Sequence, residues 1–156
     1  MLITILRHAD AEPHCVDDAA RRLTEKGYKQ AKRVGCFMKE QGIRPDIILT
    51  SPAVRARETA EIVGKILANQ NLTEVPWATC GMDPMRALDE LAAYSRFKSV
   101  LLVGHEPDLS CLIATLLGLG KSISVSVPKA SLTSIDVPRL GVGAGTLQFL
   151  LPVKFL

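Results

Sequence analysis

Three short apolar runs most restrict the fold that this 156-residue chain can adopt. They cover residues 2–6 (LITIL), 47–49 (IIL) and 100–103 (VLLV). Runs that are apolar at nearly every position are typical of strands covered on both faces of a parallel sheet. Helical patterns lie between the runs, and such alternation implies a layered α/β domain.

Four segments repeat apolar residues at the three-to-four-residue spacing of an amphipathic helix. They lie at about 24–40, 55–68, 84–94 and 107–117. In the third segment, Met85, Leu88 and Leu91 are expected to face the core. Thr24 is the expected N-cap of the first helix, and Pro107 suits the first turn of the fourth.

The C-terminal part of the chain is expected to add two strands, near 131–137 and 146–151, joined by a glycine-rich turn. These strands would extend the sheet with an antiparallel element. The predicted fold is therefore a single domain over residues 1–156. It is an α/β three-layer sandwich with a mostly parallel central sheet flanked by helices.

The composition excludes several functional classes. Hydrophobic residues make up 47% of the chain and charged residues 22%, which favours a soluble globular domain. No run approaches the roughly 18 apolar residues of a membrane span, and the apolar N-terminus is too short for a signal-peptide core, so we expect a cytoplasmic protein. A net charge of +3 and 4% aromatic residues do not indicate nucleic-acid binding. The four cysteines form no C-x-x-C pair, so there is no zinc or redox motif.

Arginines and histidines follow the three apolar runs, at the positions where the predicted strands end. The first run leads into Arg7 and His8. The second leads into Ser51, with Arg55 four residues later, and the third leads into His105. In an open α/β sheet, ligands bind in the crevice outside the carboxyl ends of the strands. If these strands are parallel neighbours, two arginines and two histidines converge on one crevice.

Two guanidiniums and two imidazoles suit a phosphoryl group. Arginine offers a planar fork of donors that matches phosphate oxygens, and phosphoryl transfer needs mainly positioning and charge stabilisation. A neutral histidine can attack phosphorus, while a protonated one can donate to a phosphate oxygen. Asp17 and Asp18 are interpreted as an isolated pair in a solvated loop, so no acidic cluster indicates a magnesium site and no cofactor is predicted.

Four segments of the chain together resemble the histidine phosphatase superfamily. They are LRHAD at 6–10, LTEKGYKQA at 23–31, SPAVRARETA at 51–60 and VGHEP at 103–107. They occur in the family's order, and CGMDP at 80–84 is similar to a segment of its SixA-type phosphohistidine phosphatase branch. The resemblance implies a phosphoglycerate mutase-like fold and a phosphatase.

The resemblance also implies roles for individual residues. His8 would be the nucleophile that becomes transiently phosphorylated, and Arg7, Arg55 and His105 would bind the phosphoryl oxygens and stabilise the transition state. Arg21 is expected at the pocket rim. Ala9 stands where the family usually has glycine, which is tolerated unless the position needs a positive φ.

Asp10 lies close to the nucleophile in sequence and is a candidate for substrate binding or proton transfer. Elsewhere, no residue convincingly matches the glutamate that larger relatives use as general acid. Among the carboxyls between residues 76 and 95, Asp83 belongs to the CGMDP segment, and Asp89 and Glu90 are expected to be exposed on a helix.

The missing general acid bears on the substrate. Imidazole, with a pKa near ~6.5, leaves more easily than an alkoxide, whose conjugate acid has a pKa comparable to the ~15.7 of water. We therefore predict hydrolysis of phosphohistidine in a partner protein, such as a phosphotransfer domain, by a monomer with a shallow pocket. The alternatives are a phosphomonoesterase for a small metabolite and a non-catalytic phosphate-binding regulatory module.

A basic stripe is predicted on the first helix, opposite its apolar face. Its members are Arg22, Lys26, Lys29 and Arg33. The stripe is either a solvated face or a docking surface for an acidic phosphoprotein. His14, in a predicted loop, is expected to have no role.

Overall fold

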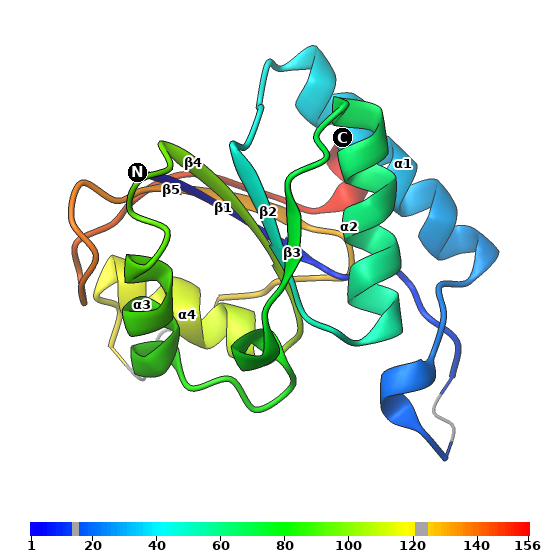
Figure 1. The fold of residues 1–156 in the computed structure, drawn as a ribbon, viewed down its shortest axis with the longest axis horizontal. Helices are drawn as coiled ribbons and strands as arrows, with labels where there is room; N and C mark the ends of the chain where they lie inside the picture. Colours follow the sequence, from blue (N-terminus) through cyan, green and yellow to red (C-terminus); the bar gives the residue numbers. More distant parts are fainter. Residues whose placement is uncertain (14–15, 121–124) are drawn as a thin grey trace.

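A computed structural model describes residues 1–13, 16–120 and 125–156, so His14 lies outside the described residues. Its strands form one six-stranded sheet in the order β3-β2-β4-β1-β5-β6 (Figure 1). The strands are β1 (Leu2–Arg7), β2 (Ile47–Thr50), β3 (Leu72–Glu74), β4 (Ser99–Gly104), β5 (Leu132–Asp136) and β6 (Thr146–Leu151). Strands β1 to β4 pair in parallel, and β5 and β6 join antiparallel. The predicted α/β fold with a mostly parallel sheet is confirmed.

Helices cover both faces of this sheet (Figure 1). They are α1 (Glu25–Glu40), α2 (Val54–Leu67), α3 (Pro84–Ala92) and α4 (Asp108–Leu117), with short 3-10 helices η1 (Asp18–Ala20), η2 (Pro76–Ala78) and η3 (Val153–Phe155). Within the described part of the chain, none of the helices has the length and apolar composition needed to cross a membrane.

The two faces of the sheet belong to separate apolar clusters. Alternate residues of each central strand point to opposite faces. In β1, Ile3 and Ile5 pack with α3 and α4, whereas Leu6 packs with α1 and α2. Since both faces are covered by helices, these strands are apolar at nearly every position, as the sequence predicted.

Local signals in the sequence set most helix boundaries. Thr24 is the N-cap of α1, as predicted, and its Oγ1 accepts a hydrogen bond from the Gly27 N–H at 3.1 Å. Pro107 is the N-cap of α4, one position before the predicted first turn. The prediction for Met85 is wrong: its side chain is 53% exposed. Met85 lies in the first turn of α3, and Ala87 faces the core in its place, beside Leu88 and Leu91.

The register of the central strands places the predicted site residues side by side. Arg7, at the end of β1, pairs with Gly104 at the end of β4. On the other side of β4, Thr50 at the end of β2 pairs with Val103. The residues that follow these three strands therefore emerge together at the carboxyl edge of the sheet.

A glycine in α1 allows the close approach of the loop that follows His8. The Asp10 carbonyl accepts a hydrogen bond from the Thr24 N–H at 3.1 Å. A Cβ added to Gly27 would overlap this carbonyl oxygen. By contrast, a Cβ added to Gly35 would meet Cδ1 of Ile66 at 2.8 Å, the end of a flexible side chain.

We predict that Gly27→Ala lowers the free energy of unfolding by about 2 kcal/mol, because overpacking against backbone outweighs the gain of about 1 kcal/mol in helix propensity. Urea unfolding measures the change. The matched control is Gly35→Ala in the same helix, which should stay within about 1 kcal/mol of the wild type. Equal stabilities of the two variants would contradict the rigid contact with Asp10.

Candidate active site

His8 follows the central strand β1 and is held by the backbone on both sides. Its N–H donates to the Gly104 carbonyl at 3.0 Å, and its own carbonyl accepts from the Ala130 N–H at 3.2 Å. The ring is nearly buried, with 6% of the residue exposed. Nδ1 lies 2.8 Å from the Ala9 carbonyl oxygen. Since a carbonyl only accepts, Nδ1 carries the proton and Nε2 of the neutral ring keeps its lone pair.

Ala9 links this ring to helix α2. Its N–H donates to Thr59 Oγ1 at 3.1 Å, and that hydroxyl donates to the Arg55 carbonyl at 2.7 Å. Ala9 is not among the described non-glycine residues with positive φ. Alanine in place of the family's usual glycine therefore causes no backbone strain.

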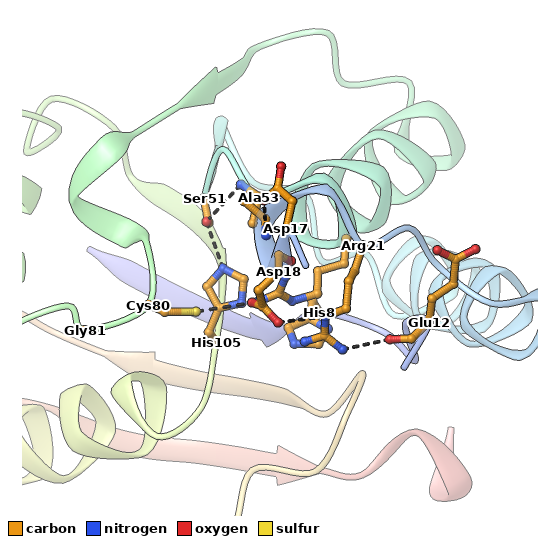
Figure 2. Close-up of polar contacts among 12 residues, drawn as sticks. His8, Glu12, Asp17, Asp18, Arg21, Ser51, Ala53, Cys80, Gly81 and His105 are labelled. Carbon is orange, nitrogen blue, oxygen red and sulfur yellow. Dashed lines mark hydrogen bonds and ion pairs between the residues drawn. The ribbon is translucent and has the colours of Figure 1, made fainter. Parts of the chain in front are cut away.

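His105 lies beside His8, with ring centroids 5.2 Å apart and planes inclined by 52°. The residue is 2% exposed, and its Nε2 is 2.8 Å from Ser51 Oγ (Figure 2). Ser51 Oγ already accepts from the Ala53 N–H at 3.3 Å, so its proton is available for Nε2. With the Ser51 hydroxyl donating to Nε2, the proton of a neutral His105 is on Nδ1, which is buried and has no partner among the described residues.

The two predicted arginines flank the histidines. Arg55, in the first turn of α2, is 2% exposed and donates to the Asp18 carbonyl at 2.6 Å and to Asp18 Oδ2 at 3.0 Å. Arg7 donates to the Val127 carbonyl at 2.9 Å. The Nε atoms of both arginines are buried without a partner in the described part of the chain. Each unmet buried donor costs about 1–3 kcal/mol, and an anion rich in acceptor oxygens is the ligand suited to such donors.

The contacts of Asp18 differ most from what the sequence predicted. Although its side chain is 42% exposed, Asp18 is not half of an isolated pair: it bonds Arg55 with Oδ2, and its Oδ1 lies 2.8 Å from Arg21 Nε. Arg21 in turn donates to the Glu12 carbonyl at 2.8 Å (Figure 2). The structure therefore places Arg21 next to Asp18 and Arg55. No sequence signal connected Asp18 to Arg55, because the contact joins η1 to the start of α2, far away in sequence.

Asp10 is also near the site, but its carboxylate is fully engaged. Oδ1 accepts from Lys129 Nζ at 2.7 Å, and Oδ2 accepts from Thr24 Oγ1 at 2.7 Å. The hydrogen bond from Lys129 is the main cause that holds the pKa of Asp10 below its usual range. An ionised, paired carboxylate is poorly suited to donating a proton.

Glu106 is a second residue that the sequence did not single out. It follows His105, and its Oε1 accepts from the Ser110 N–H at 3.1 Å. Burial raises the pKa of Glu106, while the nearby charge of Arg7 opposes the rise. Among the described carboxyls, Glu106 alone combines a raised pKa with a position at this edge of the sheet.

Burial sets the charge state of the two histidines. Desolvation is the main cause that lowers the pKa of His8 to about 3. Desolvation, followed by the positive charge of Arg55, lowers the pKa of His105 to about 4. Both rings are therefore neutral near pH 7, whereas the sequence analysis considered a protonated second histidine.

A hollow of about 330 Å³ adjoins Arg55 and Asp18 on the α2 side of the site. It is lined by Asp18, Ala19, Pro52, Ala53, Arg55, Thr79 and Cys80. In the ranges that the structure describes, no three His, Cys, Asp or Glu side chains are grouped so that they could hold a metal ion.

The site gathers two neutral imidazoles and two guanidiniums at one edge of the sheet, and comparison with known proteins shows the family of the chain. Residues 3–80 match the histidine phosphatase superfamily (branch 1). The chain is 32% identical over 119 residues to phosphohistidine phosphatase SixA of Escherichia coli (strain K12), covering 74% of each chain. It is 33% identical over 138 residues to a SixA homolog of Haemophilus influenzae, covering 80% of this chain and 82% of that protein.

The fold agrees with these matches. The structure of the protein histidine phosphatase SixA complexed with tungstate superposes with a TM-score of 0.89 at 25% sequence identity, covering 99% of both chains. The chain belongs to the histidine phosphatase superfamily.

We predict that both imidazoles titrate far below an ordinary histidine, His8 near about 3 and His105 near about 4. NMR titration of the wild type measures this, with His8→Gln and His105→Gln variants assigning the signals. Unfolded histidine titrates near ~6.5, so the unfolded chain binds more protons at intermediate pH. The contribution of the two histidines to the free energy of unfolding should therefore be complete above about pH 6.5 and should decrease as the pH is lowered towards 4. A midpoint near 6.5 for either ring would contradict the buried, neutral pair.

Proposed function

We propose that this protein is a phosphohistidine phosphatase that hydrolyses phosphohistidine in a partner protein through a phosphoryl intermediate on His8. The observation that carries the proposal is the free Nε2 of His8, fixed by the Nδ1 hydrogen bond to Ala9 and placed between the arginines and His105. The SixA relatives support the choice of phosphohistidine as substrate.

In the first step, Nε2 of His8 attacks phosphorus, and the P–N bond to the substrate imidazole breaks. The departing imidazole takes up a proton and leaves as neutral histidine. Arg7 and Arg55 bind the equatorial oxygens, and the Nδ1–H of His105 donates to one of them. These donors are already in place, so they stabilise charge in the transition state without reorganisation.

In the second step, water attacks the phosphorus of phospho-His8, and the P–N bond to His8 breaks. Inorganic phosphate leaves, and His8 recovers its lone pair. Water supplies the oxygen of the phosphate and the proton that the substrate imidazole took up, so the two steps sum to hydrolysis. Both leaving groups are imidazoles, which depart without a strong general acid.

The proposal also covers the class of partner protein and the location of this protein in the cell. The hollow beside Arg55 is only about 330 Å³, at the small end of the range for ligand pockets, which suits a side chain presented by a protein. We assign a phosphotransfer domain as the partner class. We propose that the protein acts as a monomer in the cytoplasm.

One observation favours the second candidate, a phosphomonoesterase for a small metabolite. Glu106 has a raised pKa and lies within the electrostatic influence of Arg7. A carboxyl that keeps its proton to a higher pH can protonate an alkoxide as it departs. Ester hydrolysis would need this help, whereas phosphohistidine hydrolysis would not.

We predict that the wild type, without added metal, releases phosphate faster from a phosphorylated phosphotransfer domain than from p-nitrophenyl phosphate. His8→Ala should lose at least about a thousandfold in kcat on both, because a nucleophile has been removed. Phosphate release in a coupled assay measures both rates. Preference for the ester would select the phosphomonoesterase, and binding of phosphate with no turnover of either substrate would select the non-catalytic module.

A further inference from the structure

A long groove runs from the phosphoryl site along helix α1. It consists of two adjoining hollows of about 660 Å³ and about 510 Å³. The larger hollow includes Arg7, and the two share Lys26, Gln30, Val153 and Lys154. The opposite wall comes from the C-terminal segment around η3, which lies against α1 (Figure 1). The groove therefore connects the site to a surface outside it.

The groove is basic, and its lining carboxylates are already neutralised. Asp10 pairs with Lys129 at 2.7 Å, and Glu25 pairs with Lys29 at 2.6 Å. Arg33 adds a further positive charge, while its Nε donates to the Leu156 carbonyl at 2.6 Å.

Two lysines of the groove lie outside its ion pairs. Lys26 and Lys154 are both exposed and form no ion pair with any described residue. Since the chain as a whole carries a net charge of only +3, this concentration of cations is local to the groove.

The structure changes the membership of the basic stripe predicted on the first helix. Lys26, Lys29 and Arg33 line the groove, as the helical spacing suggested. Arg22 does not, because its guanidinium pairs with Glu58 at 2.7 Å. Lysines from distant parts of the chain, at 129 and 154, complete the basic lining.

The groove also has apolar side chains beside these lysines, which a bound protein can contact. Phe155 lines the larger hollow and is 69% exposed, with Lys154 Nζ 4.8 Å from the centre of its ring. Pro152 and Val153 line the hollow beside it. An exposed aromatic ring among cations is a favourable contact for a protein surface that carries both carboxylates and apolar side chains.

We propose that this groove binds an acidic segment of the phosphohistidine-bearing substrate protein and thereby presents the phosphohistidine to His8. The inference rests on the proposed function and assigns its specificity to charge outside the catalytic site. From Lys26 to Arg33 the helix rises about 10 Å, enough to contact carboxylates on one to two turns of a partner helix. Complementary charge of this kind steers association and selects partners, and salt screens it.

The test uses two synthetic phosphohistidine peptides that are identical except for flanking Glu residues in one and Gln in the other. At low salt, the wild type should show a higher kcat/KM for the acidic peptide, and added salt should reduce the difference. In the Lys26→Glu/Lys154→Glu variant, the ratio of acidic to neutral kcat/KM should fall about tenfold, because attraction becomes repulsion. The ratio cancels any effect on the phosphoryl group that both peptides share.

The matched control is Arg96→Glu/Lys98→Glu, which makes the same change in charge before β4, at the opposite end of the sheet from the site. It should keep the wild-type ratio. A wild-type ratio near one, or an equal fall in both double variants, would overturn the groove proposal while leaving the phosphatase proposal intact.

A binding measurement tests the groove independently of catalysis. The unphosphorylated forms of both peptides, labelled for fluorescence anisotropy, are titrated with the wild type and with Lys26→Glu/Lys154→Glu. Tighter binding of the acidic form to the wild type alone supports the groove, even if neither phosphorylated peptide is hydrolysed and the proposed function fails. Equal binding of the two forms to the wild type contradicts the groove.

Discussion

The parallel pairing of β1 with β4 is the constraint on which the site depends. Neighbouring strands lie about 4.8 Å apart, and the pairing of Arg7 with Gly104 places His8 and His105 one residue beyond two adjacent strand ends. The ring centroids are accordingly 5.2 Å apart. A shift of the register by one residue would turn one of the rings to the other face of the sheet. The apolar packing on both faces is therefore what holds the two imidazoles side by side.

Burial and positive charge act together on these imidazoles. They keep both rings neutral, so His8 has a lone pair and His105 has an N–H to donate. The guanidiniums remain charged and supply the attraction for a phosphoryl group. Asp18 bonds both Arg55 and Arg21, which positions the guanidiniums and balances part of their charge at the rim. In the proposed mechanism, the nucleophile, the hydrogen-bond donor and the positive charges therefore come from different side chains.

Much of this arrangement was predictable because it depends on local pattern. The apolar runs indicated buried parallel strands, and the residues after them marked the edge of the sheet where His8, Arg55 and His105 lie. Strand β3 was missed because Leu72–Glu74 is three residues long, only partly buried at the sheet edge, and has little apolar character. Met85 was misplaced because Met85, three residues before Leu88, and Ala87, four residues before Leu91, both fit helical spacing, which alone does not say which of them faces the core.

The contacts that were missed join segments distant in sequence. Asp18 reaches Arg55 from η1, and Thr59 ties α2 to the loop after His8. Lys129 and Lys154 enter the basic groove because the C-terminal chain returns against α1. These contacts follow from the tertiary fold, and the spacing of residues within one helix or loop does not predict them.

The most direct test of the account is to trap the covalent intermediate. Wild-type protein is mixed with a phosphorylated phosphotransfer domain, quenched in alkali within a single turnover, and analysed by intact-mass and peptide mass spectrometry. If His8 is the nucleophile, one phosphoryl group should be found on His8, should form and decay as phosphate is released, and should be absent from His8→Ala. Turnover without a phosphoenzyme, or a phosphoryl group on His105 in place of His8, would contradict it.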